Sequence, residues 1–162
     1  MAIQRRMVHH HPSGQRRKLV WATTDSTVAA LAAGVATNVQ LNSALLANLP
    51  GFTVIRTHIR IQIPFVAVTD STVVGLQVVR FSDVGTARPT LPADQDTDWA
   101  YLARYYAQAT GAAIDTSREF VIDLRAKRKM EEVSQAYILM IQNNNAAAAT
   151  YHFFARTLFA LP

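Results

Sequence analysis

Hydrophobic and polar residues alternate strictly through residues 53–63. Threonines and isoleucines hold the odd positions. The even positions carry Val54, Arg56, His58, Arg60 and Gln62. Strict alternation with β-branched residues is typical of a half-buried strand, and Pro64 ends the run. The pattern predicts a strand that packs its odd face on the core and turns two arginines and a histidine outward.

Other segments also have strand character. Residues 73–81 are apolar at odd and even positions alike, which is typical of a strand covered on both faces. Further candidates are 19–24 and 28–33 as edge strands, 120–124, 136–141, and the aromatic-rich 150–161. The three asparagines at 143–145, followed by four alanines, predict a hairpin loop. Seven or eight strands at this spacing predict an all-β antiparallel β-sandwich or single jelly roll.

Helical signals are fewer, and we expect one or two short helices beside the strands. Asn38 is a candidate N-cap for a helix at 38–48, which Gly51 would end. At residues 97–110, Asp94, Asp96 and Asp98 would suit a helix N-terminus, and Trp99 and Tyr105 are spaced roughly as in a helix. This favours a helical turn leading into extended chain. The same residues also fit a strand.

The net charge of +5 resides in the first twenty residues. They contain no acid and five basic residues, Arg5, Arg6, Arg16, Arg17 and Lys18. The eleven remaining Lys and Arg are balanced by eleven Asp and Glu. We therefore expect an extended basic N-terminal arm at 1–20 and a single neutral β-sandwich domain at 21–162. Such an arm attracts nucleic acid through its phosphates, and a neutral body does not repel its own copies.

Composition and motifs restrict the classes of function. The chain has 162 residues, half of them hydrophobic, which suits one packed domain. It has no cysteine, which excludes disulfides and thiol catalysis. No serine elbow, HExxH, phosphate loop or dinucleotide fingerprint occurs, so we expect no enzyme and no cofactor. No run approaches the ~20 apolar residues of a membrane span, and polar residues at 23–27 argue against an export signal after the twin arginines.

Two charged clusters are candidate contact sites. Asp94, Asp96 and Asp98 begin like a calcium loop, but Trp99 and Tyr105 stand where that loop needs glycine and glutamate. An acidic loop or helix cap is the better interpretation, a weak cation between subunits the alternative, and no metal site is expected. The second cluster is basic and consists of Arg125, Lys127, Arg128 and Lys129. It fits a solvated connection between strands, or a contact with the three aspartates of a neighbouring subunit.

The aromatic side chains of the last strand candidate have two interpretations. Tyr151, Phe153 and Phe159 share one face, and a stacking platform for single-stranded nucleic acid needs such rings. Arg156 is the only Lys or Arg interleaved with them, so core packing is the simpler interpretation.

Five stretches together carry a resemblance. They are the basic start leading into 16–21, the strand at 53–57, the acidic loop ending in Asp98 and Trp99, the run at 122–130, and the apolar end at 161–162. Together they resemble a family of small bacteriophage capsid-type proteins. The resemblance implies a single jelly roll without enzymatic activity. It also implies a shell of many copies, whose arms contact the genome or neighbouring subunits and which includes other virion proteins. The protein would be made in the host cytoplasm and reside in the virion.

Two other functions remain open. One is a virion accessory protein, such as a decoration, tail or connector component. The other is a non-viral β-barrel module that binds nucleic acid through its basic arm. The second is disfavoured because the body shows no basic face with interleaved aromatics in its sequence.

Overall fold

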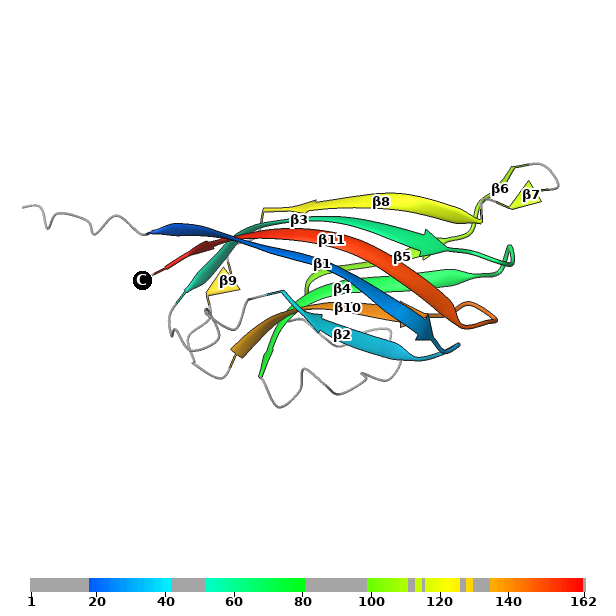
Figure 1. The fold of residues 1–162 in the computed structure, drawn as a ribbon, viewed down its shortest axis with the longest axis horizontal. Helices are drawn as coiled ribbons and strands as arrows, with labels where there is room; N and C mark the ends of the chain where they lie inside the picture. The colour runs from blue at the N-terminus through cyan, green and yellow to red at the C-terminus, as the bar shows by residue number, and fades with distance from the viewer. Residues whose placement is uncertain are drawn as a thin grey trace, which may run out of the picture.

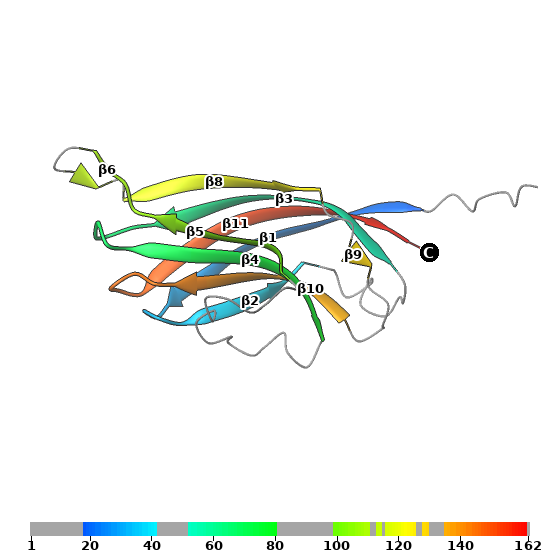
Figure 2. The same ribbon diagram turned by 180° about the vertical axis from the view of Figure 1, so that it is seen from behind.

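Two antiparallel sheets face each other across a shared apolar interior (Figures 1 and 2). This computed structural model describes residues 18–41, 52–80, 99–110, 113–114, 116–125, 128–129 and 135–161. Nearly all of these residues are extended, as the β-branched and aromatic segments of the sequence predict.

Each sheet contains four long strands. Sheet A consists, in spatial order, of β1 (Leu19–Leu31), β11 (Ala149–Ala160), β3 (Thr53–Pro64) and β8 (Ser117–Leu124), with the short β9 (Arg128–Lys129) also paired to β3. Sheet B consists of β2 (Ala36–Gln40), β10 (Gln135–Asn143), β4 (Ser71–Arg80) and β5 (Trp99–Tyr106). A separate ribbon pairs β6 (Ala109–Thr110) with β7 (Ala113–Ile114).

The strand order defines a jelly roll. Numbered one to eight along the chain, the long strands run 1-8-3-6 in sheet A and 2-7-4-5 in sheet B. Every neighbouring pair is antiparallel, and the chain crosses repeatedly from one sheet to the other. Two Greek keys wound in this way form the eight-stranded double sheet. The predicted all-β sandwich is therefore confirmed.

Alternating side chains of the two inner faces fill the interior. Sheet A contributes Ile59, Ile61 and Ile63, and sheet B contributes Leu139 and Ile141, all with no exposed surface. Two hydrogen bonds cross this interior between tyrosine and threonine hydroxyls, Thr57 to Tyr137 at 3.0 Å and Thr72 to Tyr151 at 3.1 Å. Tyr151 and its neighbours Phe153 and Phe159 are buried here, which confirms the core interpretation of these aromatics.

A polar network closes the end of the sandwich where three inter-sheet connections meet. Asp70, 1% exposed, accepts backbone hydrogen bonds from Val66, Ala67 and Ala146 at 2.7–3.1 Å. Burial raises the pKa of Asp70, but the three backbone donors outweigh it, and the net pKa lies below the ordinary value. Asn143 donates to the carbonyls of Leu31 and Ala147, so the connections after β1, β3 and β10 are held together.

The helix predictions differ from the structure wherever it describes them. Asn38 lies in β2 opposite Met140, so it is not an N-cap, and residues 42–50 lie outside the described ranges. Residues 99–106 form β5, where Tyr101 and Tyr105 turn inward and Leu102 and Arg104 turn outward. This short segment fits both the 3.6-residue period of a helix and the two-residue period of a strand. Its antiparallel pairing with β4 makes it a strand.

Three details of the strands also differ. Residues 19–31 form one edge strand, β1, rather than two. Val54 is buried although alternation predicts it outward, because a bulge at Ile55 shifts the register between Leu158 and Phe159 and reverses the faces. The asparagine and alanine loop is no hairpin: it joins β10 of sheet B to β11 of sheet A.

Candidate nucleic-acid interface

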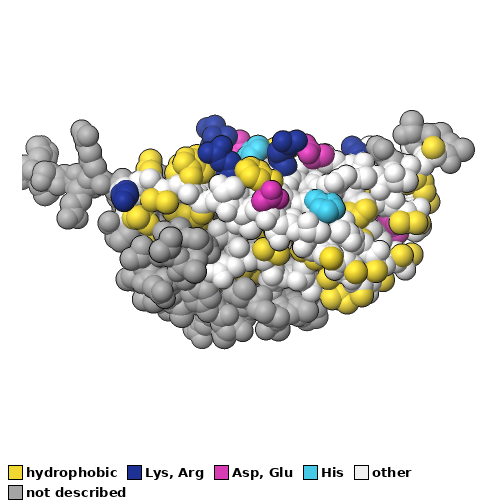
Figure 3. Space-filling model, viewed as in Figure 1, with side chains coloured by type: hydrophobic (Ala, Val, Ile, Leu, Met, Phe, Trp, Pro, Cys, Tyr) yellow, Lys and Arg dark blue, Asp and Glu magenta, His cyan; other side chains and the backbone are white. Residues whose placement is uncertain are grey.

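The outer face of sheet A presents ordered rows of polar and aromatic side chains. Because successive residues point to opposite faces of a strand, the antiparallel register places every second residue of four strands side by side. From the arm end inward, the rows are Trp21, Leu158 and Arg56; Thr23, Arg156, His58 and Asp123; Asp25, Phe154, Arg60 and Val121; and Thr27, His152, Gln62 and Glu119. In Figure 3 most charged side chains gather along the margin formed by β3, β8 and β11.

Two ion pairs join β3 to β8 across this face. Arg56 donates to both carboxylate oxygens of Asp123, at 2.8 Å from Nε and 2.5 Å from Nη2, a bidentate arrangement. The hydrogen bond and charge of Arg56 hold the pKa of Asp123 below its ordinary value, and Asp123 raises the pKa of Arg56. Arg60 is bonded to Glu119 at 2.9 Å. All four side chains are well exposed, so these pairs contribute more to register than to stability.

One hollow lies at the end of the face where β1 begins, which we call the arm end. It is lined by Trp21, Arg56, His58 and Arg156 and is here called the Trp21 hollow. Its volume is about 220 Å³. The guanidinium carbon of Arg156 lies 4.8 Å from the centre of the Trp21 ring, a cation–π contact that leaves the indole 45% exposed. The two arginines give the lining a formal charge of +2 with His58 neutral.

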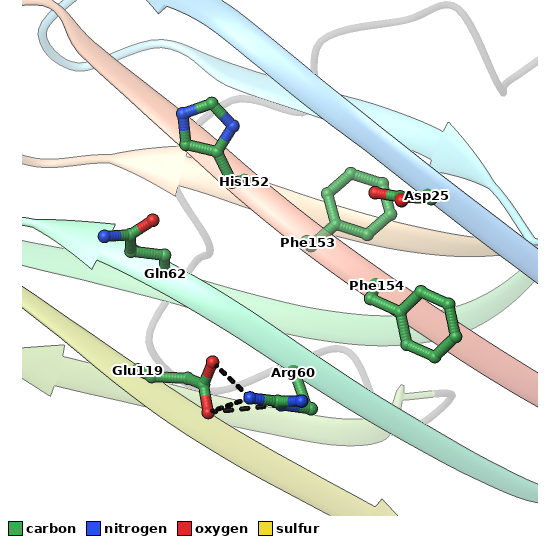
Figure 4. A pocket seen from close by; sticks show the side chains of 7 residues that line it. All are labelled: Asp25, Arg60, Gln62, Glu119, His152, Phe153 and Phe154. Carbon is green, nitrogen blue, oxygen red and sulfur yellow. Dashed lines mark hydrogen bonds and ion pairs between the residues drawn. The ribbon is translucent and has the colours of Figure 1, made fainter.

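A second hollow, here called the Phe154 hollow, occupies the middle of the same face (Figure 4). It has a volume of about 280 Å³ and is lined by Asp25, Arg60, Gln62, Glu119, His152, Phe153 and Phe154. Phe154 lies between β1 and the Arg60–Glu119 pair, and His152 points away from that pair. One arginine against two carboxylates gives this lining a formal charge of −1 with His152 neutral. The charge of the face therefore changes sign along its length.

Catalytic geometry is incomplete on the described part of this face. The Nδ1 atom of His152 lies 2.9 Å from the Thr27 hydroxyl, a nucleophile-to-base distance. In the part of the chain that the structure describes, no third group is bonded to the His152 ring to orient it as a catalytic triad requires. Among the described residues, no group of three His, Cys, Asp or Glu side chains could hold a metal ion.

The structure describes part of the predicted contact residues. Lys18 immediately precedes β1, and its carbonyl accepts a 2.8 Å hydrogen bond from the Leu161 amide. β1 begins at Leu19, two residues inside the range expected for the arm. Arg125 is exposed after β8, and Arg128 and Lys129 form β9. The remaining predicted residues lie outside the described ranges: Arg5, Arg6, Arg16, Arg17, Asp94, Asp96, Asp98 and Lys127.

Sequence reasoning missed the Trp21 hollow. Its residues come from β1, β3 and β11, which are remote along the chain, so no local motif contains them. The outward face of residues 53–63 was predicted with its two arginines and histidine, and that was the available signal. The missing information was that β11 lies between β1 and β3 and brings Arg156 beside both Trp21 and His58.

Comparison with known proteins gives only remote likenesses. No family model and no curated protein matches the chain, and no helix in its described part is long and apolar enough to span a membrane. Among solved structures, Desmodium yellow mottle tymovirus is 14% identical over 98% of this chain and 95% of its own, with a TM-score of 0.42. A 60-mer of the BFDV capsid protein is 6% identical over 91% and 95%, with a TM-score of 0.41. Cocksfoot mottle virus is 8% identical over 99% and 91%, with a TM-score of 0.37.

Proposed function

We propose that this chain is a viral coat subunit that assembles in many copies into a shell. Its basic arm at 1–20 would contact the genome or neighbouring subunits. The observation that carries the proposal is the combination of two features. The β body has the 1-8-3-6 and 2-7-4-5 strand order and no net formal charge, and it is joined to a segment of twenty residues that contains five basic residues and no acid. Eight-stranded jelly rolls of this order serve as capsid domains among other functions, so the fold alone does not decide.

The distribution of charge favours a coat subunit over the other candidate functions. Apolar side chains fill the space between the sheets, so the groups of the described body that can contact a partner lie on its outer surfaces and edges. This arrangement is expected of a subunit that binds its neighbours. A body of zero formal charge permits close packing of copies, while each copy adds five positive charges to the side where its arm lies. A structural, non-enzymatic role in the virion follows from this proposal. The sequence resemblance favours a bacteriophage, with synthesis in the host cytoplasm and other virion proteins as partners.

The second basic cluster has a place in this proposal. Arg125, Lys127, Arg128 and Lys129 would contact Asp94, Asp96 and Asp98 of a neighbouring subunit. Replacing the four basic residues by glutamate should then weaken assembly, and replacing the three aspartates by lysine in the same variant should restore it, because the contact is then formed with the charges exchanged.

Light scattering with electron microscopy on the purified protein tests the shell directly. We expect closed particles of uniform size, and their loss in nuclease or 1 M salt would show that nucleic acid holds them together. A discrete small oligomer under all conditions would contradict a shell and favour an accessory virion component.

Two full-length variants with substitutions at the same four positions, one removing and one keeping the charge, test the arm. Replacing Arg5, Arg6, Arg16 and Arg17 by glutamine should reduce nucleic acid in the particles, whereas lysine at the same positions should keep it, because phosphate contacts of this kind depend on charge. Equal nucleic acid content in the two variants would contradict a genome contact by the arm.

A further inference from the structure

The Trp21 hollow combines two features that single-stranded nucleic acid requires of a protein. One is an exposed aromatic ring on which a base can stack, and the other is fixed positive charge within reach of the adjoining phosphate. Trp21 supplies the ring from β1. Arg156 supplies charge from the neighbouring β11, and Arg56 supplies it from β3, the next strand in the sheet. We propose that this hollow binds single-stranded nucleic acid, with a base stacked at Trp21 and a phosphate on Arg156.

The rigidity of the hollow supports this assignment. Its residues stand on three hydrogen-bonded strands, and Arg156 is already positioned over the indole at 4.8 Å. Arg56 is fixed by its bidentate contact with Asp123. Little side-chain freedom therefore remains to be lost when a ligand binds, which favours affinity.

The charge around the hollow favours a polyanion over a neutral or basic ligand. Arg125, which is exposed, acts electrostatically on Asp123 and adds a third arginine to this end of the face. With Asp123 counted, the hollow and Arg125 together carry +2, while the Phe154 hollow carries −1. A strand of phosphates is thus attracted to the arm end of sheet A and repelled from its middle.

The hollow is also close to the basic arm along the chain. Lys18 precedes Trp21 by three residues, roughly 10 Å along an extended strand, and Arg16 and Arg17 come directly before it in the chain. The hollow is therefore separated by only a few residues along the chain from the basic residues of the arm. The inference deepens the genome contact proposed above and rests on it only for the nature of the ligand, since it does not require a shell.

Fluorescence separates stacking from simple attraction by charge. The full-length protein is titrated at 0.15 M salt with a 20-nucleotide oligo(dT), with oligo(rU), and with inorganic polyphosphate, which carries charge but no bases. We expect both oligonucleotides to quench tryptophan emission and polyphosphate to bind without quenching. The quenching should disappear in Trp21→Phe, because the other tryptophan, Trp99, lies over Gly75 on the opposite sheet.

Affinity measurements with matched variants locate the phosphate contact. Trp21→Ala should weaken oligonucleotide binding by about 5- to 150-fold, the range for one stacked base. Arg156→Gln should lower the salt dependence, log K against log salt, by about 0.7, the loss of one phosphate on a single strand. Arg104→Gln removes the same charge from the outer face of sheet B and should leave both quantities close to those of the unmodified protein.

Two results would overturn the proposal. One is oligonucleotide binding without quenching, which assigns all binding to the arm. The other is an equal change in salt dependence in Arg156→Gln and Arg104→Gln, which assigns it to net charge. Particle formation in the same variants, seen by electron microscopy, tests the shell independently, so failure of one proposal is distinguishable from failure of the other.

Discussion

The two outer faces of the sandwich differ sharply although both lie outside the shared interior. On sheet A, Val121 is 57% exposed and Trp21 45%, among arginines, histidines and acids. On sheet B, the corresponding side chains of the central strands are buried, with Ile138 at 0% and Met140 at 1%. Here Trp99 packs against Val73 and Met140 in a second small cluster. Sheet A therefore has a single apolar face, whereas the central strands of sheet B have two.

The difference follows from the period of each strand. β3 alternates apolar and polar residues, so it can bury only one face. β4 and β10 carry apolar residues at odd and even positions alike through their middle portions, and these residues are buried on both faces. The chemistry that a ligand could meet on the described strands is thus concentrated on sheet A, while sheet B is specialised for packing.

The largest contrast is expected from truncating one apolar side chain on each outer face. Ile138→Ala should cost about 2–5 kcal/mol of unfolding free energy, since it leaves a cavity among fully buried neighbours. Val121→Ala should cost less than about 1 kcal/mol, because that side chain is mostly in water. Urea unfolding midpoints measure both, and equal losses would contradict the buried state of the outer face of sheet B.

A smaller loss is expected from adding one methyl group to sheet B. A Cβ on Gly75 would lie 2.7 Å from Cε3 of Trp99, so Gly75→Ala should cost about 1–3 kcal/mol through overpacking. A double-mutant cycle with Trp99→Leu should show that most of this cost depends on the indole. Additive losses would mean that Trp99 does not lie on Gly75.

Asp70→Asn tests the polar network that closes one end between the sheets. We expect a loss of about 1–3 kcal/mol at neutral pH, because an amide cannot accept from all three backbone donors. The folded-state pKa of Asp70 lies below its ordinary 3.8, so its contribution is complete above that value and is lost as the pH falls through the folded-state pKa. Unfolding free energies measured from pH 7 to pH 2 should therefore converge for the two proteins. The control Asp25→Asn removes an exposed carboxylate and should change the unfolding free energy at neutral pH by less than about 0.5 kcal/mol.

The smallest effect on stability is expected from the exposed ion pair on sheet A. Asp123→Asn should shift the urea midpoint less than any change above, and 1 M salt should erase the shift. The same variant removes an acid beside the Trp21 hollow, so oligonucleotide binding should tighten. Weaker binding would mean that Asp123 is needed to hold Arg56 in place.

Periodicity predicted the all-β class and most of the strands because burial acts on each residue locally. The half-buried β3 and the doubly buried β4 were both predicted in this way. The bulge at Ile55 was not, because it depends on how β3 pairs with β11, and β5 was ambiguous because eight residues fit both periods. The Trp21 hollow could not be found locally, since it requires the register of three strands that the sequence leaves unspecified.

The place of β11 in sheet A has a consequence for how the protein is made. This strand lies between β1 and β3, so among the described strands β1 has no partner in its sheet until residues 149–160 have been synthesised. At about 5–20 residues per second, the ribosome leaves β1 unpaired for roughly 6–26 seconds. Pairing of such distant segments also makes folding slow, on the order of milliseconds to seconds. A chain cut short before β11 would lack the centre of sheet A, and the face that carries the Trp21 hollow would not form.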